Sequence, residues 1–336
     1  MRLVYFYNED WEKEYISSRL PGVEISFFAG NVNDNKNARD DAAEALSVFV
    51  SSAVGPAEMD RFPKLKLIAT RSTGFDHIDL VEAAKRGITV VSVPSYGENT
   101  VAEQAFALLL CLSRRIYDSY KQIEQSGSFS TGGLRGFDLK GKTIGIIGTG
   151  KIGKHAIRMA KGFEMNVIAY DKFPKEELMQ EFGFYYVTLD ELLAQSDIIS
   201  LHTLLTPETT HLINLENVKK IKKGAFLINT ARGGLVDTSA IIYGLAENIL
   251  AGAGLDVLEE EGNMADEMKI LTNTHPNEET LKTVLENHYL INHPRVIITP
   301  HNAFNTQEAI ERILNTTTDN IKAFADGRPE NIVAVK

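Results

Sequence analysis

Short apolar runs alternate with longer amphipathic segments along nearly the whole chain. Runs such as Thr143–Ile147 and Ala225–Asn229 contain many β-branched or apolar residues and few polar ones. This composition is typical of parallel strands that are buried on both faces. The segments between the runs have the apolar spacing of helices. The alternation therefore predicts an α/β protein in which helices connect parallel strands.

The expected strands form two series, one in the first hundred residues and one after residue 142. The first series comprises Leu3–Tyr7, Glu24–Phe28, Ser47–Val50, Leu65–Ala69 and Thr89–Val93. The second comprises Thr143–Ile147, Asn166–Tyr170, Ile198–His202, Ala225–Asn229, Gly252–Val257 and Val296–Thr299. A continuous segment with this many strands suits a doubly wound, Rossmann-type sheet that binds a dinucleotide.

A long helical pattern over residues 101–125 separates the two series, and we expect it to connect two domains. Thr100 and Glu103 have capping-box spacing at its start, and Gly127 follows its end. Residues 262–294 are polar and interrupt the rhythm of strands, which predicts an inserted, partly helical excursion. A final amphipathic helix is expected near the C-terminus, with an apolar stripe formed by Ile310, Ile313, Leu314, Ile321 and Phe324.

Composition narrows the possible partners and compartment. The 336 residues are enough for about two domains. A net charge of -10 and a pI near 5.4 argue against a nucleic-acid or anionic-membrane partner. Cys111 is the only cysteine, so no intrachain disulfide can form. With neither a signal-peptide pattern nor an apolar run near ~18 residues, we expect a cytoplasmic protein. We expect no metal site.

A glycine-rich turn follows the strand that ends at Ile147. The sequence GTGKIG places Gly148, Gly150 and Gly153 between a strand and a helix-like stretch. Glycines in this context let the backbone approach a pyrophosphate, whose charge is favoured at the helix N-terminus. The turn therefore predicts a nicotinamide dinucleotide site. A glycine-rich turn without a ligand is the simpler alternative.

Asp171 ends the next strand, 18 residues beyond Gly153. This is near the spacing of the carboxylate that binds the adenosine ribose hydroxyls. Such a carboxylate repels a 2'-phosphate, which favours NAD over NADP, although the neighbouring Lys172 weakens the exclusion. Alternatively, Asp171 caps the next turn, a common position for aspartate.

Three ionisable residues follow three late strands of the second series: Arg232, Glu261 and His301. Ligands bind at this edge of a doubly wound sheet. Arg232 can bind a carboxylate through two hydrogen bonds, and His301 can donate a proton to a carbonyl or accept one. Glu261 can stabilise the imidazolium. Each residue alone is more often an ordinary surface or core residue, and the pattern does not distinguish among Glu259, Glu260 and Glu261.

Sequence motifs spread over nearly the whole chain carry a family resemblance: TRSTGFDHIDL, VPSYGENTVAE, IGIIGTGKIGKHAIRMAKGFEMNVIAYD, ISLHTLLTPETTHLIN, INTARGGLVDT, GAGLDVLEEE and ITPHNAF. The chain resembles the D-isomer-specific 2-hydroxyacid dehydrogenases, most closely their fermentative D-lactate dehydrogenase branch. The resemblance implies a flavodoxin-like substrate domain over residues 1–99 and 302–336. It also implies an NAD-binding Rossmann domain over residues 100–301, and a homodimer.

The same resemblance implies roles for further residues. Glu261 becomes the catalytic acid, Tyr96 lies over the substrate and Phe304 walls the pocket. The substrate carboxylate is bound by Arg232 and by the backbone N–H groups of Ser72, Thr73 and Gly74. Besides the three glycines and Asp171, the implied cofactor contacts are Lys151, Ile152, Thr203, Leu204, Thr209, Thr230, Ala231, Arg232, Asp256 and His301.

The expected activity is NAD-dependent interconversion of a small 2-oxo acid and its D-2-hydroxy acid, with His301 as proton donor and acceptor. The resemblance favours pyruvate and D-lactate. Two alternatives stay open. One is a dehydrogenase of the same family for a branched oxo acid, glyoxylate or hydroxypyruvate. The other is an NAD-sensing regulatory protein, which the presence of Arg232, Glu261 and His301 disfavours.

Overall fold

A computed structural model describes residues 1–261 and 278–334. Contacts divide the chain into two compact units, Met1–Gly97 with Asn305–Lys336, and Glu98–Phe304. These limits lie within three residues of the division expected from the sequence. The α/β fold class is confirmed, because both units are built on parallel sheets with helices on their faces.

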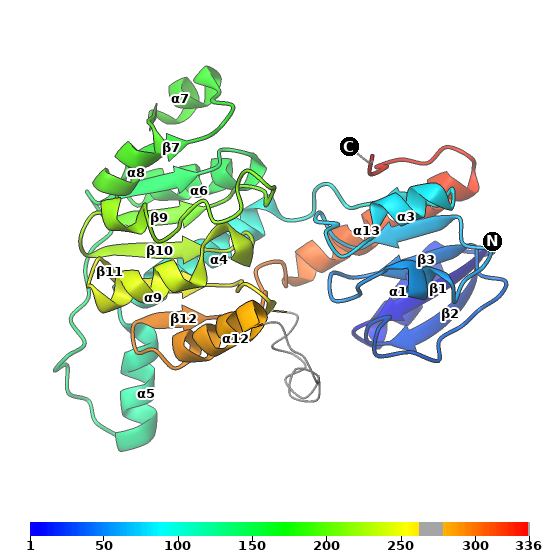
Figure 1. The fold of residues 1–336 in the computed structure, drawn as a ribbon, viewed down its shortest axis with the longest axis horizontal. Helices are drawn as coiled ribbons and strands as arrows, with labels where there is room; N and C mark the ends of the chain where they lie inside the picture. The colour runs from blue at the N-terminus through cyan, green and yellow to red at the C-terminus, as the bar shows by residue number, and fades with distance from the viewer. Residues whose placement is uncertain (262–277, 335–336) are drawn as a thin grey trace. The chain divides into compact units, whose positions relative to one another are not determined.

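The described part of the smaller unit contains a five-stranded parallel sheet in the order β2-β1-β3-β4-β5, which is the flavodoxin-like order. Its strands are β1 (Arg2–Tyr7), β2 (Glu24–Ala29), β3 (Ala45–Val48), β4 (Leu67–Thr70) and β5 (Thr89–Val91). Successive side chains of β1 enter opposite cores. One core lies under α1 (Trp11–Arg19) and α13 (Gln307–Ala325), and the other under α2 (Pro56–Met59) and α3 (Leu80–Lys85) (Figure 1).

The described part of the larger unit contains a seven-stranded parallel sheet in the order β12-β11-β10-β9-β6-β7-β8. Its strands are β6 (Thr143–Ile147), β7 (Asn166–Tyr170), β8 (Tyr185–Tyr186), β9 (Ile198–Leu201), β10 (Ala225–Asn229), β11 (Leu250–Leu255) and β12 (Val296–Ile298). The six strands β6 to β11 lie in the order β8-β7-β6-β9-β10-β11, which is the Rossmann order when β6 is counted as the first strand. The order reverses between β6 and β9, so a ligand crevice is expected beyond the carboxyl ends of these two strands.

Helices cover both faces of this sheet (Figure 1). On one face, α4 (Glu98–Ser113) and α6 (Lys151–Gly162) bury the core that includes Ile144 and Ile146. On the other, α8 (Leu189–Gln195), α9 (Thr238–Ala246) and α12 (Glu278–Ile291) bury a core that includes Leu201 and Leu255. The described part of the unit also contains the helices α5 (Ile116–Ser126), α7 (Glu176–Phe182), η1 (Val218–Lys220) and η2 (Gly233–Leu235).

The prediction of one helix over residues 101–125 is wrong. The helix begins at Glu98, so Thr100 lies inside it and does not cap it. It then breaks after Ser113, because Arg115 adopts a left-handed conformation with φ 53° that redirects the chain into α5. The predicted end is confirmed, since Gly127 terminates α5 at φ 64°.

The other helical predictions have mixed outcomes. The final amphipathic helix is confirmed as α13. The expected excursion at 262–294 is partly helical in α12, while residues 262–277 lie outside the described part of the chain.

The short strand β8 was not predicted. Within the described ranges, no helix is both long and apolar enough to cross a membrane.

Candidate active site

The three glycines of the turn after β6 serve different purposes. Gly148 has φ 92°, and a Cβ there would lie 2.8 Å from the carbonyl carbon and oxygen of His202. A Cβ at Gly153 would lie 2.0 Å from the carbonyl oxygen of Gly148. Both positions therefore require glycine for packing. A Cβ at Gly150 would meet nothing within 4 Å, so this glycine instead keeps space open at the N-terminus of α6.

Buried polar atoms line the strand ends beside this turn. The Nδ1 atom of His202 after β9 and the hydroxyl of Thr230 after β10 have no hydrogen-bond partner among the described residues. Burial lowers the pKa of His202 to about 4, so its ring is neutral at physiological pH. Unpaired polar groups and an open helix N-terminus fit a dinucleotide, which supplies an anionic pyrophosphate and many hydrogen-bonding groups.

Asp171 holds the end of β7 against the glycine turn. Its Oδ2 atom accepts hydrogen bonds from the backbone N–H and the hydroxyl of Thr149, at 2.7 and 2.9 Å. Its Oδ1 atom accepts from the backbone N–H of Phe173 at 2.8 Å. The structure thus places the predicted ribose-binding carboxylate beside the glycine turn, and it also shows the turn-capping contact of the alternative interpretation.

Asp256 shapes the turn that carries His301. The Asp256 side chain is 1% exposed and accepts hydrogen bonds from the backbone N–H groups of Asn302 and Ala303, at 2.9 and 2.8 Å, and from the Thr299 hydroxyl. Burial raises the pKa of Asp256. His301 adopts φ 50°, an unusual conformation for a residue with a side chain, and its N–H donates to the Asp256 carbonyl at 2.7 Å.

His301 and Glu261 meet directly. Nδ1 of His301 lies 2.6 Å from Oε1 of Glu261. The other carboxylate oxygen of Glu261 accepts from the backbone N–H of Leu258 at 3.2 Å. This contact identifies Glu261 as the member of the acidic triplet that pairs with His301. The carboxylate can fix the tautomer and orientation of the ring, which directs Nε2 to a reacting group.

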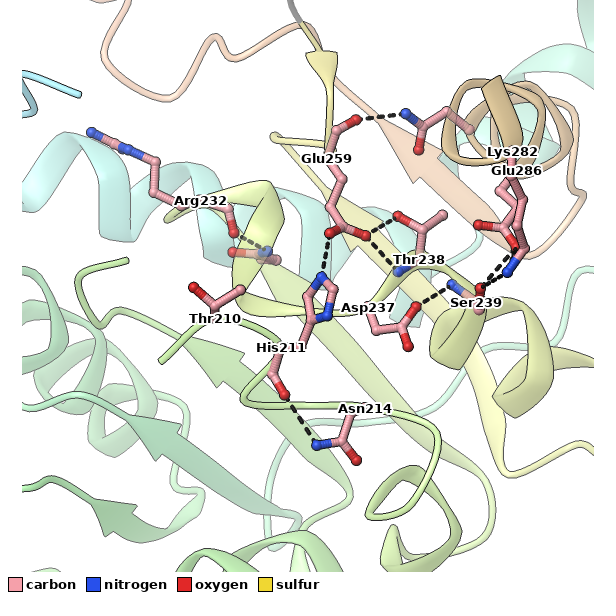
Figure 2. Close-up of polar contacts among 12 residues, drawn as sticks. Thr210, His211, Asn214, Arg232, Asp237, Thr238, Ser239, Glu259, Lys282 and Glu286 are labelled. Carbon is pink, nitrogen blue, oxygen red and sulfur yellow. Dashed lines mark hydrogen bonds and ion pairs between the residues drawn. The ribbon is translucent and has the colours of Figure 1, made fainter. Parts of the chain in front are cut away.

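Arg232 follows β10 at the same edge of the sheet. Its carbonyl accepts from the Nδ2 atom of Asn229 at 2.9 Å, and its Nη1 donates to the Ala231 carbonyl at 2.8 Å. Figure 2 shows its guanidinium pointing away from the side chains of Glu259 and His211. The next residue, Gly233, packs so closely that a Cβ would lie 2.1 Å from the Leu258 carbonyl. The loops that carry Arg232 and Glu261 are therefore in contact.

Other predicted cofactor residues lie on the same edge of the larger unit. Lys151 and Ile152 begin α6, and the Lys151 ammonium lies 3.4 Å from a Glu98 oxygen. The loop after β9 carries Thr203 and Leu204, whose carbonyl accepts from the Thr209 hydroxyl at 2.7 Å. Leu204 is 76% exposed, so this loop presents an apolar side chain to solvent. The N–H of Ala231 donates to Asn229 Oδ1 at 3.0 Å.

The smaller unit carries the predicted substrate loop. The hydroxyl of Ser72 donates to the Gly74 carbonyl at 2.6 Å, and the hydroxyl of Thr73 donates to the Val93 carbonyl at 2.8 Å. Within the described chain, the N–H groups of Thr73 and Gly74 donate no hydrogen bond. Tyr96 belongs to this unit, where its carbonyl accepts from Arg312 Nε, whereas Phe304 ends the larger unit.

A further polar cluster was not predicted. His211, Thr238, Glu259 and Asn287 are joined by hydrogen bonds next to the Arg232 and Glu261 loops (Figure 2). A lone histidine in a loop and one of three consecutive glutamates give no sequence signal for such a role. In the described chain, no group of three or more His, Cys, Asp or Glu residues could hold a metal ion.

Comparison with known proteins identifies the family. Residues 106–303 match the sequence profile of the D-isomer specific 2-hydroxyacid dehydrogenase NAD-binding domain. The chain belongs to the D-isomer-specific 2-hydroxyacid dehydrogenases. It is therefore an oxidoreductase of this family, and the predicted family and NAD cofactor are confirmed.

Similar proteins within the family differ in their named substrates. The pyruvate reductase of Chlamydomonas reinhardtii superposes with a TM-score of 0.85 and 36% identity, covering 98% of this chain and 97% of that one. The Aquifex aeolicus D-lactate dehydrogenase, complexed with NAD and lactic acid, gives a TM-score of 0.85 and 35% identity over 99% of both chains. Glyoxylate reductase of Thermococcus litoralis is 40% identical, covering 86% of this chain and 83% of its own.

Proposed function

We propose that this dehydrogenase reduces pyruvate to D-lactate with NADH and catalyses the reverse reaction. The contact of 2.6 Å between His301 and Glu261 carries the proposal, because a histidine paired with a carboxylate is suited to exchange a proton with a carbonyl oxygen. Arg232 at the same edge supplies the positive charge that the carboxylate of a 2-oxo acid requires.

The bound cofactor and three residues of the larger unit have separate roles in the proposed reaction. Bound NADH supplies the hydride and NAD accepts it in the reverse direction. Nε2 of His301 donates a proton to the carbonyl oxygen and takes it back when the hydroxy acid is oxidised. The Glu261 carboxylate accepts the hydrogen bond of Nδ1–H and stabilises the imidazolium. Arg232 orients the substrate by binding its carboxylate through two parallel hydrogen bonds.

The choice of pyruvate is supported by likeness to the pyruvate reductase and the D-lactate dehydrogenase, each aligned over almost the whole chain. The similarity to glyoxylate reductase supports glyoxylate as the second candidate. The roles of Ser72, Thr73, Gly74, Tyr96 and Phe304 in binding the substrate stay predictions. The two unbonded N–H groups of the loop at Thr73 and Gly74 support the predicted carboxylate contact.

We also propose that the enzyme is a homodimer. Helix α5 buries none of its residues, and Ile116, Tyr120 and Ile123 are 53%, 63% and 44% exposed. Phe129, just beyond its end, is 85% exposed. Apolar side chains gathered in this way favour an interface with another protein surface. Light scattering of the purified protein tests the proposal, and a monomeric mass at micromolar concentration would exclude it.

A substrate panel tests the proposed activity. Purified protein is assayed for loss of nicotinamide absorbance with pyruvate, glyoxylate, hydroxypyruvate and a branched 2-oxo acid, each with NADH and with NADPH. We expect the highest kcat/KM for pyruvate with NADH. A higher value for glyoxylate would support the second candidate and reject pyruvate as the preferred substrate.

A further inference from the structure

The polar cluster of His211, Thr238, Glu259 and Asn287 lies outside the catalytic set described above. Figure 2 shows Glu259 at its centre, with His211 approaching from the loop after β9 and Thr238 from the start of α9. Glu259 is two residues from Glu261 along the chain. The cluster therefore joins the loop of the proposed catalytic acid to two other elements at the same edge of the sheet.

Both carboxylate oxygens and the backbone carbonyl of Glu259 accept hydrogen bonds. Oε2 accepts from the backbone N–H and the hydroxyl of Thr238, at 2.8 and 2.7 Å, and Oε1 accepts from Nε2 of His211 at 2.5 Å. The Glu259 carbonyl accepts from Nδ2 of Asn287 in α12 at 2.7 Å. The Glu259 side chain is 16% exposed, so these bonds are largely protected from water.

His211 connects the cluster to the loop of Arg232. Its backbone N–H donates to the carbonyl of Gly234 at 2.8 Å, two residues beyond Arg232. Its φ of 51° lies in the left-handed region, which a residue with a side chain adopts only when its surroundings hold it there. His211 therefore contacts the Arg232 loop through its backbone and the Glu261 loop through its ring.

The same residue ends the loop that carries the predicted cofactor contacts. Thr209 closes this loop by donating from its hydroxyl to the Leu204 carbonyl, and the ring of His211 follows two residues later. The loop of Arg232, the loop of Glu261 and the loop with the predicted cofactor contacts are thus linked through the pair of His211 and Glu259. A displacement of about 1 Å in such groups can reduce a rate by about a hundredfold.

We propose that His211 and Glu259 form a positioning pair that holds Arg232 and Glu261 in their relative places for hydride transfer. The inference rests on the proposed function, since it concerns the same reaction. Neither residue needs to touch the substrate. The pair acts through the backbone next to Arg232 and Glu261. Its loss should therefore lower kcat more than it weakens the binding of NADH.

Four variants test the pair: Glu259→Ala, Glu259→Gln, His211→Ala and the double alanine variant. The control is Glu286→Gln, because Glu286 bonds to Ser239 and Lys282 and, among the described residues, makes no hydrogen bond or ion pair with Glu259. For each variant we measure kcat and KM with the best 2-oxo acid, the Kd for NADH by fluorescence, and the melting temperature. His211 is 43% exposed, so its truncation is compatible with folding.

We expect Glu259→Ala and His211→Ala each to lower kcat by roughly tenfold or more, with the Kd for NADH changed by less than about threefold. The double variant should be no slower than about the slower single variant, because the two residues act as one unit. Glu259→Gln keeps a hydrogen-bond acceptor and should recover most of the rate. Glu286→Gln should keep the wild-type kcat.

The inference is wrong if either single alanine variant folds and keeps the wild-type kcat, or if the two losses multiply in the double variant. A loss of NADH binding equal to the loss of kcat would also overturn it, since it would indicate general damage to the fold. Failure of the proposed function gives a different result, because wild-type protein would then turn over no 2-oxo acid.

Discussion

Nδ1 of His301 and Oε1 of Glu261 lie 2.6 Å apart, although 40 residues separate them in the chain. The contact joins the turn after β12 to the loop after β11. Glu259, two residues earlier, binds a different histidine, His211. Glu259 and Glu261 therefore contact different histidines. We propose that the Glu261 carboxylate orients His301 and that Glu259 fixes the loop.

Replacing His301 by asparagine should reduce kcat by about 10²- to 10⁴-fold, the usual contribution of a general acid–base group. Glu261→Gln retains an acceptor for Nδ1–H but removes the charge that stabilises the imidazolium, so a smaller loss is expected. Steady-state kinetics with NADH check both effects. His288→Asn in α12 is the control. Wild-type kcat in His301→Asn would remove this residue from the reaction.

Gly150→Ala should weaken NADH binding by roughly tenfold or more while changing the free energy of unfolding by less than about 1 kcal/mol. The new methyl group enters space that no protein atom occupies within 4 Å, so the fold tolerates it and the cofactor does not. Gly162→Ala at the end of α6 also places its Cβ in open space and serves as the control. Fluorescence titration and denaturant unfolding give the two quantities, and unchanged NADH affinity in Gly150→Ala would contradict the cofactor placement.

Much of the larger unit could be predicted from sequence because its strands are buried on both faces. Thr143–Ile147, Asn166–Tyr170 and Ala225–Asn229 have the predicted limits, since each is a short apolar run followed by polar or turn residues. The glycine turn could also be predicted from the sequence, because the spacing of its glycines reflects close backbone contacts at Gly148 and Gly153.

The unpredicted features depend on tertiary contacts. The helical pattern of the sequence continues through Arg115. The helix nevertheless ends there, and no glycine or proline in the sequence indicates this end. After the break, Gly136 packs so tightly that a Cβ would lie 2.0 Å from the Ser113 carbonyl oxygen. Likewise, the residue pattern did not distinguish among the three glutamates. The fold shows that Glu259 contacts His211, which was not predicted, while Glu261, the residue that the family resemblance favoured, contacts His301.

Asp171→Ser should lower the preference for NADH over NADPH, measured as the ratio of kcat/KM values, by about tenfold or more. Removal of the carboxylate ends its repulsion of the 2'-phosphate, and Lys172 beside it can then attract that group. Asp190→Ser, which breaks a surface ion pair with Lys220, controls for loss of a negative charge. An unchanged ratio would indicate that Asp171 only caps the turn, as its bonds to Thr149 and Phe173 also allow.

His202 should make the cofactor-free protein less stable in mild acid. Burial lowers its pKa from 6.5 to about 4 in the folded chain, so the unfolded chain takes up the proton first as the pH falls. The free energy of unfolding is therefore unaffected by this group above its unfolded pKa, and decreases by about 2 kcal/mol between about pH 7 and about pH 4.5. Urea unfolding should show a smaller decrease for His202→Gln. Equal decreases in the two proteins would show that His202 is not responsible.

The most direct test of the proposed activity is the product formed from pyruvate and NADH by the purified wild-type protein. We predict one D-lactate for each NADH oxidised, identified by chiral chromatography, together with loss of this product in His301→Asn. Tight NADH binding with no turnover of pyruvate or any other 2-oxo acid would contradict the account and favour a regulatory NAD-binding protein.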